Sequence, residues 1–168
     1  MAEALLAATL HERGIAAHVS SAGRVSEGQP ATDTAVDTMA ERGLDISGHR
    51  SRRMSAPMLA QADLIVAMTR EHLREAAVLH PDCYGRTFTL KELVRRGAHE
   101  GPRAPGESLD DWLVRLHKTR RPIDHLGSSA VDDVADPVGQ EPHVYEQTAV
   151  ELEGLTTGLA DLLWPPER

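Results

Sequence analysis

Aromatic residues and cysteine are scarce in this 168-residue sequence, which holds one Phe, two Trp, two Tyr and a single cysteine, Cys83. With so few rings, a surface that binds nucleic acid by stacking bases on aromatic side chains is not expected. One thiol cannot form an internal disulfide, a zinc site built on several cysteines or a two-cysteine redox relay. Such cysteine usage is typical of the reducing cytoplasm, where we expect the protein to function.

Long apolar runs and an excess of positive charge are also lacking. No stretch approaches the ~18 consecutive apolar residues of a membrane span, so we expect neither a membrane helix nor a signal peptide. The formal net charge of -8 at pH 7 argues against binding to nucleic acid or to an anionic membrane. Hydrophobic residues make up 40% of the chain and charged residues 26%, which is enough for the core of one ordinary domain.

Metal-ligating residues are present but not clustered. The nine histidines include no His-x3-His pair, the spacing that places two rings on one helix face, so we expect no metal site. Cys83 lies in a turn without a glycine-rich cradle and is interpreted as structural. The basic run Lys118–Arg121 ends a predicted helix, and we attribute it to the favourable interaction of cations with the helix dipole.

Apolar periodicity predicts helices that alternate with strands. We expect helices over 1–13, 32–42, 55–62, 69–79, 90–96, 108–120 and 141–163, and strands over 15–20, 63–68 and 86–90. The near-continuous apolar run 63–68 is typical of a strand buried on both faces of a parallel sheet. The alternation implies an α/β fold with helices on both faces of that sheet. Three strands are fewer than such a sheet usually has, so we expect either a small three-stranded variant or a sheet that lacks one strand ahead of Met1.

Three short motifs could carry chemistry. Asp136 precedes a proline in a loop, where its carboxylate could act as a general acid, although Asp-Pro also commonly starts a plain turn. Ser20–Gly23 follows the first predicted strand, at the sheet edge where open α/β folds bind ligands, or it is an ordinary turn. Ser47–Arg53 holds His49 and three arginines and could bind an anion, or it is a solvated basic loop.

Taken in order, the motifs resemble a known family. The sequence contains M-A-E-A-L-L, V-S-S-A-G, R-G-L-D-I-S-G-H-R-S-R, A-D-L-I-V-A-M-T-R-E-H, R-T-F-T-L-K-E-L and D-V-A-D-P-V-G. Together these segments resemble the low-molecular-weight protein-tyrosine phosphatases, whose fold some arsenate reductases share. The resemblance covers 1–168 as a single domain, except that 98–129 reads as an insertion with an extra helix. It implies a doubly wound parallel sheet of strand order 2-1-3-4, from which the first, central strand is missing here.

The resemblance also implies a mechanism. In this family a Cys-x5-Arg-Ser loop opens the first helix, and its backbone N–H groups cradle a phosphate. The cysteine thiolate attacks phosphorus while the arginine grips the equatorial oxygens. By this resemblance Asp136 is the general acid that protonates the leaving oxygen and then activates water. Ser21 and His49 support the phosphate loop, and Val138 stands where many members place an aromatic wall for the substrate ring.

The Cys-x5-Arg-Ser loop itself is absent from the 168 residues. We therefore expect an N-terminally truncated reading of a phosphatase. A full-length product would hydrolyse phosphomonoesters of the phosphotyrosine class, on a phosphorylated protein or a small molecule and without a cofactor, and this chain would be inactive. One alternative is a pseudophosphatase that binds or regulates a partner without catalysis. Another is arsenate reduction, although Cys83 does not lie in the late segment where the family's disulfide relay is expected.

Overall fold

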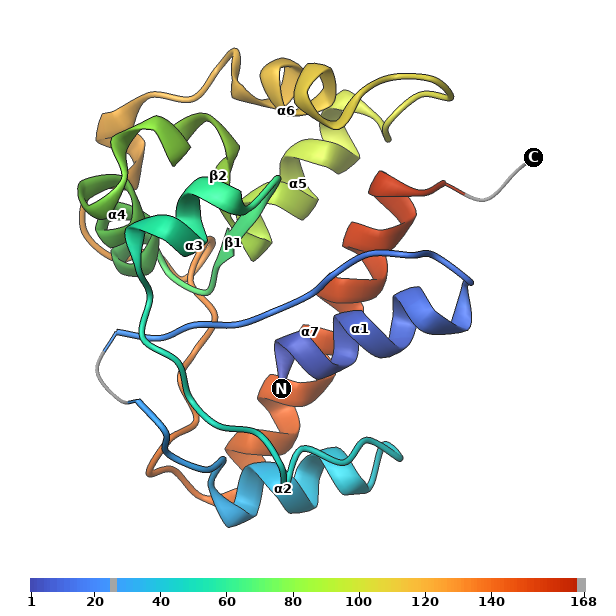
Figure 1. Ribbon diagram of the computed structural model, residues 1–168, viewed down its shortest axis with the longest axis vertical. Helices are drawn as coiled ribbons and strands as arrows, with labels where there is room; N and C mark the ends of the chain where they lie inside the picture. Colours follow the sequence, from blue (N-terminus) through green and yellow to red (C-terminus); the bar gives the residue numbers. More distant parts are fainter. Residues whose placement is uncertain (25–26, 166–168) are drawn as a thin grey trace. The chain divides into compact units, whose positions relative to one another are not determined.

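The computed structural model describes residues 1–24 and 27–165, and its chain forms two units (Figure 1). The units are composed of 1–53 with 135–160, and of 54–134 with the residues from 161 onward. Among the described residues, no helix combines the length and the apolar character needed to cross a membrane.

The first unit is helical. Its helices are α1 (Ala2–Glu12), α2 (Asp33–Ala40) and most of α7 (Pro142–Leu163). The Thr32 hydroxyl caps α2 by accepting a hydrogen bond from the Ala35 N–H at 3.3 Å, and it donates one to the Tyr145 hydroxyl of α7 at 3.3 Å. Just after α2, the Arg42 guanidinium donates from Nη1 to Glu146 Oε2 at 2.9 Å. Arg42 Nε also donates to Glu153 Oε2 at 3.4 Å, so polar contacts at both ends of α2 hold this helix against α7.

Residues 15–20 differ from prediction, because they form no strand. A strand exists only where its backbone groups pair with a neighbour. Within the described part of this unit, pairing is limited to two isolated bridges, Gly23 with Arg53 and Pro30 with Arg50. The apolar pattern of 15–20 supplies suitable side chains but no partner, so the predicted strand is wrong.

The second unit contains the sheet. Strands β1 (Ile65–Ala67) and β2 (Thr87–Thr89) pair in parallel, with Val66 opposite Phe88. Both lie inside the predicted ranges, so the cores of these two strand predictions are confirmed. The other elements are α3 (Ala56–Gln61), α4 (Arg70–Leu79), η1 (Pro81–Arg86), α5 (Leu90–Glu100), α6 (Leu109–His117) and η2 (Pro122–His125).

Helix α5 is longer than predicted, since it continues past Gly97 to Glu100. Gly97 lies where a Cβ would stand 2.6 Å from a Leu162 methyl carbon and 3.2 Å from the Trp112 ring. The glycine therefore allows close packing within the helix and does not end it. The buried Trp112 also donates its indole N–H to the Gly101 carbonyl at 3.1 Å, which fixes the chain just after α5.

A buried ion cluster joins α5 to the segment that follows α6. The Glu92 side chain, 2% exposed, accepts hydrogen bonds at Oε1 from Arg120 Nε at 2.9 Å and Arg96 Nε at 2.8 Å. His125 Nε2 lies 3.2 Å from the same oxygen. The Arg120 guanidinium stacks over the Phe88 ring, 4.0 Å from its centroid. Arg120 was attributed above to the helix dipole, but it is instead the buried counter-ion of Glu92.

The pKa of Glu92 reflects this cluster. Burial raises it, but the hydrogen bonds from His125 and Arg120 and their charges outweigh burial and lower the pKa from 4.5 to about 2. A carboxylate with a depressed folded pKa stabilises the protein fully above its unfolded pKa. That stabilisation is lost as the pH falls through the folded pKa.

Replacing Glu92 by Gln is expected to lower the free energy of unfolding at neutral pH by about 3 kcal/mol, because Arg120 would stay buried without its counter-charge. The loss should shrink at about pH 3, where the wild-type carboxylate is already losing its advantage. Urea denaturation at both pH values measures the difference, with the exposed Asp110→Asn as control. An equal loss at the two pH values would contradict this account.

Candidate functional site

Two of the candidate residues, Ser21 and His49, converge on one carboxylate. The Ser21 hydroxyl donates a hydrogen bond to Glu3 Oε2, and His49 Nδ1 lies 3.9 Å from the same oxygen. Glu3 belongs to the first turn of α1, and its side chain is only 29% exposed. Residues from three separate segments therefore meet at the N-terminal end of α1. Glu3 was not among the predicted site residues, because its one signal in the sequence is its place in the M-A-E-A-L-L segment.

Backbone hydrogen bonds bring the segments of Ser21 and His49 side by side. The Gly23 N–H donates to the Arg52 carbonyl at 2.8 Å, and the Gly28 N–H to the Ser51 carbonyl at 2.8 Å. The basic segment thus runs beside the turn after Ser21, with Arg52 and Arg53 exposed. The backbone of the basic segment therefore lies close to the segment that carries Ser21, whose own side chain contacts the Glu3 carboxylate.

Arg50 has a different role from Arg52 and Arg53. Its Nη1 donates to the carbonyls of Ser47 at 3.1 Å and of His49 at 2.7 Å. Because these bonds close the turn around His49, Arg50 stiffens the loop that carries the histidine.

Asp136 lies in an exposed turn of the same unit. Its Oδ1 accepts a hydrogen bond from the Val138 N–H at 3.0 Å, a local bond that fixes the side chain over its own turn. Among the described residues, no hydrogen bond joins Asp136 to Ser21 or to His49. Val138 is 62% exposed and aliphatic. An exposed carboxylate in a fixed turn is able to exchange protons with a bound substrate and with water.

The two aspartates just before this turn are bound differently. Asp132 is buried and accepts hydrogen bonds from Arg70 and Arg95. Asp133 accepts from the backbone N–H of Arg70 at 2.7 Å and of Ser129 at 2.8 Å. Neither aspartate was predicted as functional: the motif D-V-A-D-P-V-G includes Asp133 and leaves out Asp132. Two adjacent carboxylates ahead of Asp136 and an arginine at the start of α4 were the signal available in the sequence.

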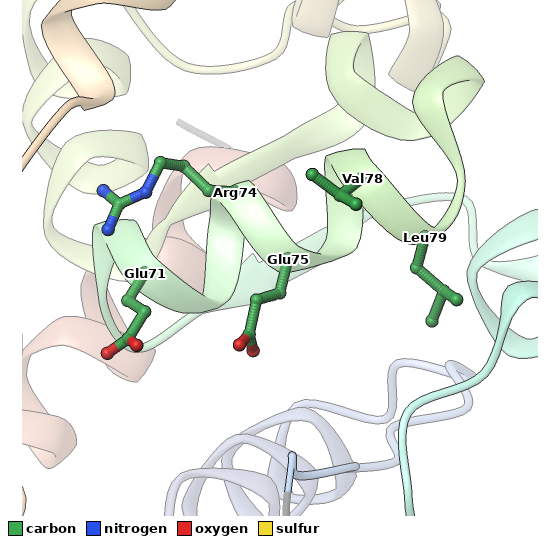
Figure 2. A pocket seen from close by; sticks show the side chains of 5 residues that line it. All are labelled: Glu71, Arg74, Glu75, Val78 and Leu79. Carbon is green, nitrogen blue, oxygen red and sulfur yellow. The ribbon is translucent and has the colours of Figure 1, made fainter.

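An open pocket of about 490 Å³ lies along α4 in the second unit (Figure 2). It is lined by Glu71, Arg74, Glu75, Val78 and Leu79. All five residues come from one helix, and none is a candidate from the sequence. Within the described residues, no group of three or more His, Cys, Asp and Glu is arranged to hold a metal ion.

Comparison of the sequence with known proteins gives a consistent family. A family model described as low molecular weight phosphotyrosine protein phosphatase matches residues 1–103. The chain is 32% identical over 118 residues to a probable low molecular weight protein-tyrosine-phosphatase of Ralstonia solanacearum, covering 70% of this chain and 79% of that protein. It is 30% identical over 164 residues to the protein-arginine-phosphatase of Bacillus subtilis, covering 97% of this chain and 87% of that protein.

Solved structures agree with this result. A low molecular weight protein tyrosine phosphatase from T. tengcongensis superposes with a TM-score of 0.72 at 30% identity, covering 96% of this chain and 88% of that one. The arginine phosphatase YwlE, as a mutant with a phosphorylated active-site serine in place of a cysteine, gives 0.71 at 30% identity, covering 96% and 84%. The expected α/β fold is confirmed. The chain belongs to the low molecular weight phosphotyrosine protein phosphatase family.

Proposed function

We propose that this chain forms the greater part of a cytoplasmic phosphatase that hydrolyses phosphomonoesters of the phosphotyrosine class through a cysteinyl-phosphate. The Cys-x5-Arg-Ser loop that performs the attack is not among the 168 residues. The proposed activity therefore belongs to a product that carries this loop ahead of α1, and the 168 residues alone are inactive. The segment 98–129, which holds α6 and η2, is proposed as an insertion, in line with a family match that ends at residue 103.

One observation carries the proposal. Ser21 and His49 come from separate segments and meet at Glu3, in the first turn of α1. In this family the phosphate loop opens the first helix, so side chains that meet at the first turn of α1 are suited to support that loop. A helix N-terminus and its free N–H groups favour a bound phosphate, and fixed polar side chains beside it hold the loop in shape. This meeting point supports a role for Ser21 and His49 in shaping the phosphate site.

The proposed mechanism has two steps. The thiolate of the loop attacks phosphorus, the bond between phosphorus and the leaving oxygen breaks, and Asp136 gives its proton to that oxygen. The Asp136 carboxylate then takes a proton from water, which attacks phosphorus, breaks the sulfur–phosphorus bond and releases phosphate. The phosphorylated active-site serine of the YwlE mutant supports a covalent phosphoenzyme in a relative.

Phosphoarginine is the second candidate substrate. The Bacillus subtilis protein-arginine-phosphatase matches this chain over 164 residues, a longer match than that to the Ralstonia solanacearum tyrosine phosphatase. By the family resemblance, Val138 also stands near the position where many members place an aromatic wall for the substrate ring. An aliphatic side chain gives up the stacking energy that favours an aromatic substrate.

The first test concerns activity itself. A product with the Cys-x5-Arg-Ser loop should hydrolyse phenyl phosphate, and the 168-residue chain should not. Asp136→Ala in the longer product should lower kcat by about 10²-fold or more, because general acid catalysis contributes that much. Asp110→Ala is the matched control on an exposed aspartate. Hydrolysis by the purified 168 residues that survives Asp136→Ala would refute the proposal. A longer product that folds and binds phosphopeptide without turnover would favour the pseudophosphatase.

The second test concerns substrate choice. Val138→Tyr in the longer product should raise kcat/KM for a phosphotyrosine peptide over a phosphoarginine peptide by about two- to tenfold, the range of one aromatic contact. Val150→Tyr, at another exposed valine, is the control. An unchanged ratio, or the same change at both positions, would show that Val138 does not face the substrate.

A further inference from the structure

The D-D-V-A-D-P stretch places three carboxylates in three environments. Asp132 is buried, Asp133 is half-buried and Asp136 is exposed. Among the described residues, Asp132 is ion-paired with two arginines, Asp133 accepts from two backbone N–H groups, and Asp136 accepts one local bond within its own turn. The first two carboxylates are therefore held by other segments of the chain, and the exposed one is not.

Asp132 is held by two arginines from different helices. Its Oδ2 accepts from Arg70 at Nε, 2.9 Å, and at Nη2, 2.6 Å, at the start of α4. Its Oδ1 accepts from Arg95 Nη1 of α5 at 2.6 Å. Burial raises the pKa of Asp132, but these hydrogen bonds and charges outweigh it, so its pKa lies below the ordinary value and the group stays ionised.

The next two residues extend this anchor. The Asp133 carboxylate accepts hydrogen bonds from the backbone N–H groups of Arg70 and Ser129. The Val134 N–H donates to the Met68 carbonyl, directly after β1, at 2.8 Å. Side chains and backbone thus bind residues 132–134 to β1, α4 and α5.

The residues that follow are held far more loosely. From 135 to 141 nearly every residue is exposed, and the described hydrogen bonds of this stretch are local, such as Gln140 N–H to the Pro137 carbonyl at 2.9 Å. Asp136 follows Val134 by only two residues, so the anchor at 132–134 limits the backbone conformations that are open to the start of its loop. A misplacement of about 1 Å costs catalysis about 10²-fold, so an anchor here has a chemical consequence.

We propose that Asp132, clamped between Arg70 and Arg95, is a positioning residue that fixes the start of the Asp136 loop for proton transfer. The inference rests on the proposed function, in which Asp136 is the general acid. A buried ion pair is a weak device for stability, because desolvation offsets most of its attraction. Its value lies in geometry, since two guanidinium groups fix both oxygens of the carboxylate at once.

Hydrogen exchange on the 168-residue chain tests the anchor. Asp132→Asn should speed amide exchange in the segment 130–140 at least about tenfold, while peptides from α6 stay unchanged. Arg95→Gln is the second variant, because its half-exposed side chain can be shortened without leaving a cavity. Asp110→Asn is the matched control. Unchanged exchange in 130–140 in both folded variants would overturn the proposal.

Leaving-group dependence tests the positioning role in the longer product. Phenolate needs protonation as it leaves, whereas p-nitrophenolate leaves readily without it. Asp132→Asn and Arg95→Gln should therefore lower kcat/KM for phenyl phosphate about tenfold more than for p-nitrophenyl phosphate. Equal losses would reveal a merely structural role and overturn the proposal. If the wild-type longer product hydrolyses neither ester, the proposed function fails, and the exchange result still decides whether Asp132 holds the segment.

Discussion

The carboxyl end of β1 is the point on which the second unit depends. There the Met68 carbonyl accepts the Val134 N–H, and Thr69 caps α4 by accepting from the His72 N–H at 3.3 Å. Arg70 follows at once and binds both Asp132 and Asp133. One strand end thus joins a sheet, a helix and the approach to the Asp-Pro loop. Parallel α/β proteins commonly place function at this edge, because side chains from separate loops meet there.

Charge, more than apolar burial, holds the segment between α6 and the Asp-Pro loop. Arg120 near its start is paired with Glu92, and Asp132 near its end is paired with two arginines. Between them Ile123 and Leu126 are exposed. Each buried carboxylate would be costly if its partners were lost, so the segment has one strongly favoured geometry. A hydrophobic anchor of similar size would tolerate more shifts of register.

The sequence alone predicts elements whose causes are local. The helices predicted from residues 69 and 108 and the apolar run 63–68 depend on neighbouring residues. The structure confirms them, with Thr69 and Ser108 as the residues that cap α4 and α6 and with β1 inside the apolar run. The strand expected at 15–20 fails because pairing requires a partner that local pattern does not supply. Helix α5 continues past Gly97 because Trp112, which is distant in sequence, packs into the space that the glycine leaves.

In the candidate site, too, some residues were predicted from the sequence, whereas their contacts are seen only in the structure. Ser21, His49 and Asp136 were found through a resemblance, and the meeting of the first two at Glu3 became visible only in three dimensions. Ion pairs such as Asp132 with Arg95 join residues that no local pattern connects. Sequence spacing indicates a motif, but it does not distinguish an exposed carboxylate in a local turn from one that is buried between two arginines.

The surroundings of Cys83 decide whether its thiol could be the nucleophile of the proposed mechanism. Its side chain is fully buried, its thiol donates to the Ala76 carbonyl at 3.6 Å, and the Thr87 hydroxyl donates to its sulfur at 3.3 Å. A nucleophile for a phosphomonoester must be reachable, and it needs backbone N–H groups and an arginine to neutralise the phosphate. Cys83 has neither access nor such a cradle. The single thiol of the sequence is therefore not suited to be the nucleophile of the proposed mechanism.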